Sequence, residues 1–393
     1  MPNEMFSHVQ FTGTDGTRMP DRMHHSRGRV ARQAHVGIPD GTVEEEIGRS
    51  GFFGRASHIY RRNPPVGWTR IEGPLRPRAY AAAELGAPGD DWVAVRATFL
   101  ENDDARLSFA RLRGAMPYAF RNADADEVIF VHAGRGAMEC DFGALDFEAG
   151  HYLVVPRGTT YRLRAEDLAS FLVIETAGEV SIPERGLLGR HALFDPDVID
   201  VPDPARLAPS VPDGGEHELR IQRGREITRV VYPFDPIDCE GWKGDLSVWR
   251  LHVRDIRPIA SERYHLPPTA HATFVAEGVA ICTFLPRPLE TGDPTALKVP
   301  FFHANVDYDE VIFYHRGRFF SREGVGAGMV TFHPAGIHHG PQPGAARAAA
   351  DLERTDETAV MVDVRRPLRA TAEASRVERT DYWASWMTKE AKG

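Results

Sequence analysis

An internal repeat constrains this chain more than any other feature of its sequence. The segment RNADADEVIFVHAG ends at Gly134 and HANVDYDEVIFYHRG ends at Gly317, so EVIF, a histidine and a glycine recur at an offset of 183 residues. Downstream, GHYLVVPRGTTY (150–161) matches GMVTFHPAGIHH (328–339), with two glycines and a proline at the same spacing. Two copies of one unit predict two similar domains that arose by duplication.

Short runs of β-branched and aromatic residues make up both copies. DWVAVRATFL and SFLVIETAG lie in the first half, and LSVWRLHV and AVMVDVRR lie in the second, mostly bounded by Gly, Pro or Asp. Runs of this kind predict antiparallel strands joined by tight turns, as in a sandwich or barrel. We therefore predict an all-β protein with two jelly-roll β-barrels.

The segments outside the repeat set the predicted domain boundaries. The beginning of the chain is polar, a Pro-, Asp- and Glu-rich stretch separates the two copies, and the end has a helical apolar pattern with Tyr382, Trp383 and Trp386. The predicted ranges are an N-terminal arm at 1–50, a first barrel without metal at 51–180, a connecting segment at 181–230, a second barrel with a metal site at 231–370, and a short helical tail at 371–393.

Charge and cysteine content exclude several classes of protein. The chain has 393 residues, a net charge of −9, three widely spaced cysteines and no run that approaches 18 apolar residues. Its short basic cluster, RGRVARQ (27–33), is typical of a solvated arm. We expect a cytoplasmic protein without disulfides that binds neither nucleic acid nor a membrane.

One stretch of the second copy gathers groups that can bind a metal. His303, Asn305 and Glu310 form H-x-N-x4-E-x6-G, and His339 ends G-x5-P-x-G-x2-H; the two patterns resemble the two motifs of the cupin superfamily. The resemblance implies barrels of the cupin type. Residues at even separation on a strand share a face, so His303 and Asn305 point inward together. Two histidines and a carboxylate leave three coordination positions open, as in non-haem Fe(II) oxygenases.

The first copy serves as an internal control for this reading. Phe120 stands at the position of His303 and Tyr161 at that of His339, whereas Glu127 remains. We therefore expect the N-terminal barrel to bind no metal. Asn122 matches Asn305, which indicates a role beyond ligation.

Further residues of the second copy resemble the homogentisate 1,2-dioxygenase family. FHPAGIHHGP (332–341) ends in that family's His-Gly-Pro, and YHLPPTAHATF (264–274) precedes FFHAN in the family's order. The resemblance implies that His303, Glu310 and His339 hold Fe(II) and that His265 exchanges a proton with a ring hydroxyl. It makes His333 and Asn305 further catalytic candidates.

The candidate substrate contacts follow the same resemblance less closely. They are Arg316, Arg318, Phe319 and His338; a local structural role is the alternative for His338 and for His271. Phe319 stands where the family has a tyrosine that fixes the substrate carboxylate, so Arg318 or Arg322 would replace it, or the substrate would lack the acetate arm. Relative to that family, one extra residue separates His303 from Glu310.

The resemblance implies an enzyme of aromatic catabolism, such as tyrosine and phenylalanine degradation. It would open the ring of homogentisate or a related para-diphenolic acid with O2, as a homo-oligomer of three or six chains. Three alternatives stay open: a dioxygenase for gentisate, a hydroquinone or a natural-product phenol; a Mn- or Zn-dependent isomerase; and a small-molecule binder without catalysis.

Overall fold

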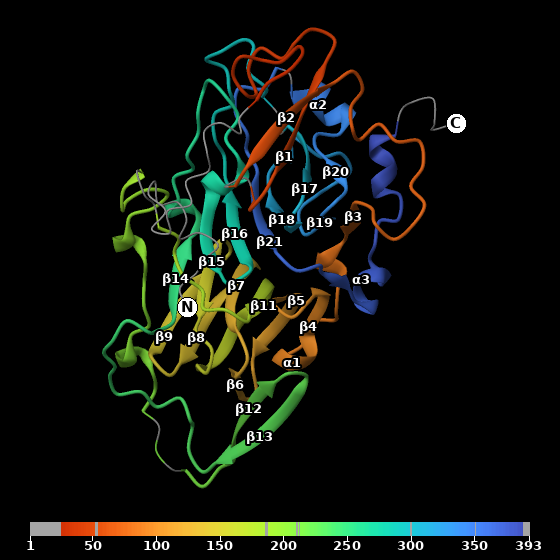
Figure 1. Cartoon of the computed structure of the whole chain (residues 1–393). Coiled ribbons are helices and arrows are strands. Elements are labelled where there is room, and N and C mark those ends of the chain that lie inside the picture. Colours follow the sequence, from red (N-terminus) through yellow and green to blue (C-terminus); the bar gives the residue numbers. More distant parts are fainter. Residues whose placement is uncertain are drawn as a thin grey trace.

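Two β-barrels, one from each copy of the repeat, lie against each other (Figure 1). The computed structural model describes residues 25–51, 54–184, 188–209, 211, 213–298, 301–349 and 351–387. The expected arm therefore falls partly outside the described residues, over 1–24, as does the end of the tail. The prediction of an all-β fold from a duplication is confirmed, and no helix in the described ranges is long and apolar enough to cross a membrane.

The N-terminal barrel is built on one large sheet that begins after the short helix α1 (Trp92–Val95). Its strands are β4 (Arg96–Glu101), β5 (Ala105–Ala115), β6 (Ala119–Asn122), β7 (Asp126–Ala133), β8 (Arg135–Cys140), β9 (Gly143–Glu148), β10 (His151–Val155), β11 (Thr160–Thr176), β12 (His217–Arg223), β13 (Glu226–Tyr232) and β14 (Trp249–His252). The hairpin of β12 and β13 extends from the lower end of the molecule in Figure 1.

The C-terminal barrel consists of a six-stranded and a four-stranded sheet. The first has the order β15-β16-β21-β18-β19-β3, and the second has the order β2-β1-β17-β20. The bounds are β1 (Val43–Gly48), β2 (Ala56–Arg61), β3 (Arg78–Tyr80), β15 (Ala272–Ala276), β16 (Val279–Phe284), β17 (Phe302–Asn305), β18 (Asp309–Arg316), β19 (Val330–His333), β20 (His338–His339) and β21 (Thr358–Val364).

Sheet pairing divides the chain differently from the predicted ranges. β1 runs parallel to β17, and β3 pairs with β19, so residues 43–80 complete the C-terminal barrel rather than begin the N-terminal one. Conversely, β12 to β14 join the N-terminal barrel, and β22 (Arg369–Ala370) pairs with β4. A local pattern predicts a strand but not its distant partner, which explains the difference.

The matching strands β7 and β18 have two apolar faces. In β18, Val311 and Phe313 join the core between the two barrels, whereas Ile312 and Tyr314 face the barrel interior. β7 follows the same period-2 alternation, which explains the uninterrupted apolar run in each copy. The matching His132 and His315 meet across this interface, with their Nδ1 atoms 3.1 Å apart.

The tail is helical, as predicted; its first helix packs on β4 of the N-terminal barrel, and its last turn packs on the C-terminal barrel. It contains α3 (Ala372–Arg376) and a 3-10 helix at Tyr382–Trp386, in which Tyr382 and Trp386 are buried against Val66 and Ala79. The remaining helices are α2 (Pro343–Ala349) and short 3-10 turns at Ala82–Glu84, Pro196–Val198, Pro204–Arg206, Val253–Asp255 and Pro268–His271.

Candidate metal centre

Three strands of the C-terminal barrel bring the predicted metal ligands together. β17 and β20 pair with His303 opposite His339, and β18 carries Glu310. Glu310 Oε2 lies 3.4 Å from His339 Nε2 and 3.9 Å from His303 Nε2. All three residues are buried, and their donor atoms lie within 4.8 Å of one another. This arrangement, called the triad below, fits one metal ion held by two imidazoles and a carboxylate.

Backbone carbonyls determine which ring nitrogen faces the triad. His303 Nδ1 lies 3.0 Å from the Phe301 carbonyl oxygen, and His339 Nδ1 lies 3.5 Å from that of Ile337. A carbonyl oxygen only accepts a hydrogen bond, so Nδ1 carries the proton and Nε2 keeps its lone pair. Metal-binding histidines are commonly oriented by such a bond from the other ring nitrogen.

The ionisation of the triad also suits a metal ion. Burial lowers the pKa of His339 to about 3, because a buried imidazolium would lose its hydration. Burial raises the pKa of Glu310, but the neighbouring imidazoles outweigh it and hold that pKa well below its usual range. Both groups are therefore in the deprotonated form that metal binding requires.

His333 orients the carboxylate of the triad. Its Nδ1 lies 2.7 Å from Glu310 Oε1, and its Nε2 lies 3.3 Å from the Tyr382 hydroxyl. Burial lowers the pKa of His333 to about 4 despite the charge of Glu310, so the ring is neutral and donates from Nδ1. Asn305 is buried at the end of β17, where its backbone carbonyl accepts a hydrogen bond from Gly336.

A pocket borders the triad and contains His265. His303 and Glu310 line one part of it, and aromatic rings, among them Phe301, line another. His265 Nδ1 lies 2.9 Å from Glu290 Oε1, and burial lowers the pKa of His265, although Glu290 opposes this. The neutral ring donates from Nδ1, which leaves Nε2 able to accept a proton.

Two buried guanidinium groups line the same pocket. Arg287 NH1 lies 3.6 Å from Glu357 Oε1, and it makes no hydrogen bond within the described residues. Arg322 donates from NH1 to the carbonyls of Ser321 and Gly340. Buried cations attract anionic groups strongly, because the surrounding dielectric constant is low.

Four predicted substrate contacts lie outside the lining of this pocket. Arg316 and Arg318 are exposed at the end of β18, and the Phe319 ring packs edge-on against Tyr314 at 4.5 Å. His338 Nε2 lies 2.7 Å from Glu45 Oε1, on the opposite face from His339. Consecutive residues of a strand alternate between faces, and the turn after β18 faces solvent, which explains why these residues have other surroundings.

The corresponding region of the N-terminal barrel is closed by side chains. Glu127 Oε2 accepts a hydrogen bond from the Tyr161 hydroxyl at 2.7 Å, and Arg96 NH2 lies 2.7 Å from Glu127 Oε1 and 3.1 Å from Glu175 Oε2. The Phe120 ring packs edge-on against Tyr161 at 5.6 Å. The Arg96 guanidinium thus balances two buried carboxylates.

Sequence reasoning missed Glu290, Arg287 and Glu357. All three are buried, Arg287 and Glu357 in the pocket lining and Glu290 behind His265, yet none belongs to a motif. Burial of a charged residue is the signal that identifies them, and it becomes visible only in the folded chain. Arg322 was predicted only as a replacement for the missing tyrosine, and it does line the pocket.

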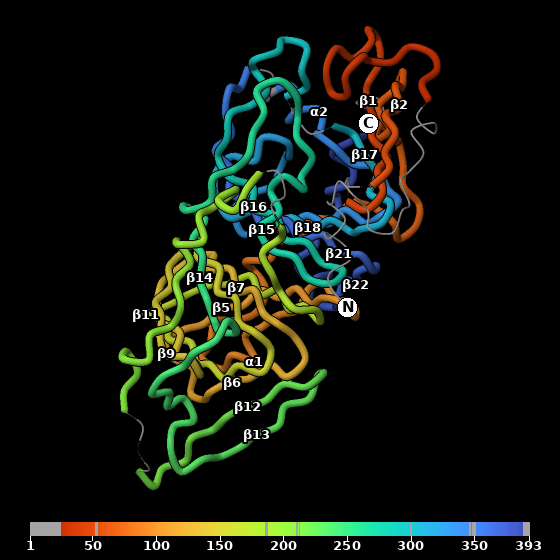
Figure 2. Tube along the Cα trace, turned by 60° about the vertical axis from the view of Figure 1, so that its left-hand side comes forward, coloured from red at the N-terminus to blue at the C-terminus, as the bar shows by residue number. Residues whose placement is uncertain are grey.

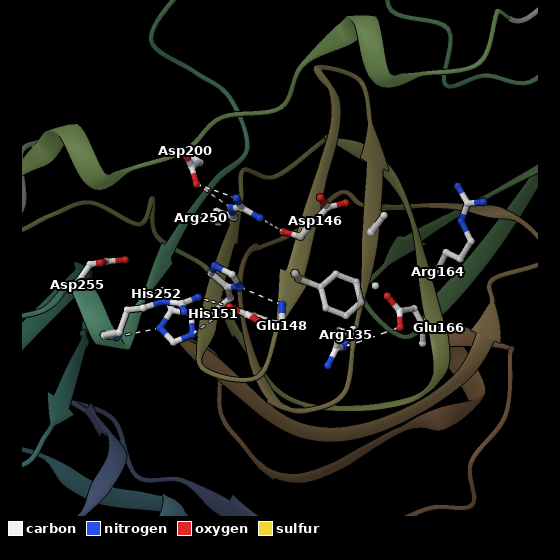
Figure 3. Close-up of a pocket in the computed structure, with 15 residues that line it drawn as sticks. Arg135, Asp146, Glu148, His151, Arg164, Glu166, Asp200, Arg250, His252 and Asp255 are labelled. Carbon is white, nitrogen blue, oxygen red and sulfur yellow. Dashed lines mark hydrogen bonds and ion pairs between the residues drawn. The ribbon is translucent and has the colours of Figure 1, made fainter.

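A larger cleft, of about 720 Å³, lies on the N-terminal barrel and β14 (Figure 3). It contains a second histidine–carboxylate group of Glu148, His151 and His252. His252 accepts the backbone N–H of Arg254 at Nδ1 and donates from Nε2 to the Ala149 carbonyl, while Glu148 pairs with the Arg254 guanidinium. These bonds leave His252 no lone pair, so we assign no metal to this group.

Two curated proteins and one solved structure illustrate what this chain is similar to. A protein of Saccharolobus solfataricus, whose name provisionally describes a dioxygenase, is 31% identical over 388 residues, covering 93% of this chain and 99% of that protein. The homogentisate 1,2-dioxygenase of Bradyrhizobium diazoefficiens is 24% identical over 289 residues, covering 70% of this chain and 63% of that enzyme. A cupin 2 conserved barrel domain protein from Leptotrichia buccalis, a solved structure, is 10% identical, covering 69% of this chain and 88% of its own, with a TM-score of 0.31.

A family model gives the same assignment for the middle of the chain. The model described as the N-terminal part of homogentisate 1,2-dioxygenase matches residues 107–252, which include most of the N-terminal barrel. The relative from S. solfataricus extends the similarity to nearly the whole length. The chain therefore belongs to the homogentisate 1,2-dioxygenase family.

Proposed function

We propose that the chain is a non-haem Fe(II) dioxygenase that opens the ring of homogentisate or a closely related para-diphenolic acid. The triad of His303, Glu310 and His339, which borders the pocket of His265, carries the proposal. These three side chains would hold an iron(II) ion, which would supply the redox chemistry with O2 and positions for a chelating substrate.

His265 acts as the base in this proposal. Its Nε2 accepts the proton of a ring hydroxyl, which makes the aromatic ring richer in electrons. Glu290 accepts the Nδ1–H bond at 2.9 Å, fixes the tautomer and stabilises the imidazolium that forms. Replacing Glu290 by Gln should therefore lower kcat about 10- to 100-fold, the usual effect of removing an orienting partner.

In this proposal, Arg287 and Arg322 interact with the acidic group of the substrate. Phe319 cannot supply the hydroxyl of the family's tyrosine, whereas Arg287 and Arg322 are buried in the pocket lining. We propose that Arg287 binds the substrate carboxylate and Arg322 contributes charge. Arg287→Met should raise KM for a diphenolic acid far more than for the parent hydroquinone, which has no carboxylate.

One observation favours a second substrate. Phe319 packs against Tyr314 outside the pocket lining, so the contact that the family makes with an acetate arm is absent here. A dioxygenase for gentisate, a hydroquinone or a natural-product phenol would use the same triad and the same His265. The position of the carboxylate on the preferred substrate distinguishes these alternatives.

The assembly and setting belong to the proposal as well. As the resemblance of the sequence to this family implies, we propose a cytoplasmic homo-oligomer of three or six chains that degrades aromatic compounds. Light scattering of the metal-loaded protein measures the number of chains directly. A monomer at micromolar concentration contradicts this part of the proposal and leaves the chemistry untouched.

Oxygen uptake by anaerobically Fe(II)-loaded protein tests the reaction. The substrates are homogentisate, gentisate and hydroquinone, and His303→Ala is the control. Uptake with homogentisate that the control lacks supports the first proposal, and uptake only with another diphenol supports the second. Bound iron without any uptake contradicts both and favours an isomerase that uses Mn or Zn, or a binding protein.

A further inference from the structure

A second group of potential metal ligands lies beside the triad, with three of its residues in the segment predicted to be an N-terminal arm and His58 in the range predicted as the first barrel. β1 supplies Glu44 and Glu46, β2 supplies His58, and the turn before β1 supplies His35. His35 and both glutamates are buried, and His58 is partly buried. The proposed ring opening uses none of these four residues.

Three donor atoms of this group converge on one point. Glu46 Oε2 lies 3.4 Å from His35 Nε2 and 3.3 Å from His58 Nε2, and all three donors lie within 4.8 Å of one another. Bonds of about 2.1 Å to a tetrahedral ion place neighbouring ligand atoms about 3.4 Å apart. His58 Nε2 is buried and, among the described residues, forms no hydrogen bond of normal geometry.

Glu44 holds His35 in the orientation that a metal ligand needs. Glu44 Oε1 lies 2.7 Å from His35 Nδ1, and both carboxylate oxygens accept the His35 backbone N–H, at 3.1 and 3.2 Å. His35 also has φ = 64°, a left-handed conformation that costs a non-glycine residue free energy. These contacts leave Nε2 directed toward Glu46, as in carboxylate–histidine–metal arrangements.

The group shares one sheet face with the triad. Glu46 of β1 lies opposite His58 of β2 and opposite His303 of β17, and His303 lies opposite His339. Directly opposed residues point to the same face, so these four side chains form a row across the sheet, whose β1 and β2 lie beside β17 in Figure 2. Strands are about 4.8 Å apart, which places the two groups about 10 Å from each other.

The ring of His35 connects this group to the pocket. It stacks on Phe301 with 4.4 Å between ring centroids and 14° between planes. Phe301 lines the pocket, and its carbonyl oxygen bonds His303 Nδ1. A change in the position of His35 therefore reaches a pocket wall and a triad ligand through one residue.

We propose that His35 Nε2, His58 Nε2 and Glu46 Oε2 form a second site, for a divalent first-row metal ion such as Zn²⁺. Two imidazoles and a carboxylate suit this class of ion, and one coordination position stays open for water. Burial lowers the pKa of His35, but Glu44 and Glu46 outweigh it and raise that pKa to about 9, so the ion displaces a proton from His35 when it binds. The bound ion then balances the charge of the two carboxylates and links the segment before β1 to β2. This site binds metal whether or not the proposed dioxygenase reaction is correct.

Zinc binding to a protein without the triad tests the second site. The full chain with His303→Ala and His339→Ala is stripped with a chelator, equilibrated with Zn²⁺ and desalted, and its zinc is counted by mass spectrometry. We expect one zinc per chain, and none once His58→Gln is added. The matched control adds His191→Gln instead, at an exposed histidine paired with Asp195 at 3.0 Å, and should keep the zinc.

Three results would overturn this site: no zinc in the triad-free protein, equal zinc after His58→Gln, or loss of zinc in the His191→Gln control. If the triad-free protein does not fold, wild type should bind two zinc ions per chain and His58→Gln one. Equal numbers in those two proteins contradict the site.

Tryptic cleavage tests separately whether the bound ion holds the segment before β1 against β2. Arg27, Arg29 and Arg32 are exposed in the segment before β1. Zinc should slow cleavage there several-fold in the triad-free protein and leave the rate in the His58→Gln protein unchanged. Identical rates with and without zinc in the triad-free protein contradict this role.

Discussion

The two barrels keep the same buried carboxylate but balance its charge in different ways. In the N-terminal barrel, Glu127 pairs with the guanidinium of Arg96 and the hydroxyl of Tyr161. In the C-terminal barrel, the ion-pair partners of Glu310 in the described part of the chain are three imidazoles. The first carboxylate thus has a counter-ion fixed to the chain, whereas the second can exchange protons or metal.

The interiors of the barrels differ in the same sense. A large apolar cluster, which includes Trp92, Phe120 and Phe147, fills the N-terminal barrel. A smaller cluster around Ile312 and Tyr314 leaves the C-terminal barrel with a pocket. The two copies of one unit thus form a filled barrel and one with a pocket, and they differ at both histidine positions of the triad.

Replacement of His303 and His339 by the residues of the N-terminal barrel should produce the largest effect on metal binding and oxygen uptake. The double variant His303→Phe, His339→Tyr gives the C-terminal barrel the side chains of Phe120 and Tyr161. We expect loss of the triad metal and oxygen uptake at the level of the buffer control, because Glu310 alone cannot hold the ion. The control is His338→Gln, on the opposite face of the strand, which should keep both the triad metal and the oxygen uptake. Retained uptake in the double variant would refute the ligand assignment.

Removal of the Arg96 guanidinium should have the next largest effect, a decrease in the free energy of unfolding. Arg96→Met leaves Glu127 without a cationic partner in the interior and Glu175 with Arg106 alone, which should cost about 3–5 kcal/mol of unfolding free energy. The control is Arg113→Met, which removes an exposed ion pair with Asp167 and should lower the unfolding free energy by less than about 1 kcal/mol. Urea unfolding at pH 7 measures both; equal losses would mean that Arg96 does not stabilise the barrel.

The interface between the barrels should respond to acid. Burial lowers the pKa of His132 to about 4, below the value near 6.5 that it has in the unfolded chain. The unfolded chain therefore binds this proton more readily, so the free energy of unfolding is highest above pH 6.5 and falls as the pH drops toward 4. His132→Gln should therefore reduce the loss of unfolding free energy between pH 7.5 and 4.5 by about 2–3 kcal/mol.

Urea unfolding at those two pH values provides the measurement for this interface, with His191→Gln as the exposed control. Only the difference between the two pH values is compared, because the substitution itself changes packing against Phe109 and Phe313. An unchanged acid-induced loss in His132→Gln would contradict a neutral histidine at the interface.

The sequence by itself determined the features that rest on local spacing. The repeat, the period-2 strands and the separation of His303 from Asn305 lie within short segments, and strand geometry alone places residues at even separation on one face. The substitution of Phe120 and Tyr161 likewise marked one barrel as different without any tertiary information.

Only the tertiary structure decided which distant segments complete each site. Glu46 lies opposite His303 although 257 residues separate them, and Glu290 reaches His265 from another loop. Arg316 and Arg318 lie near the triad in sequence, yet the turn directs them to solvent. Sheet register and burial result from the free energy of the whole fold, so no short stretch of sequence contains them.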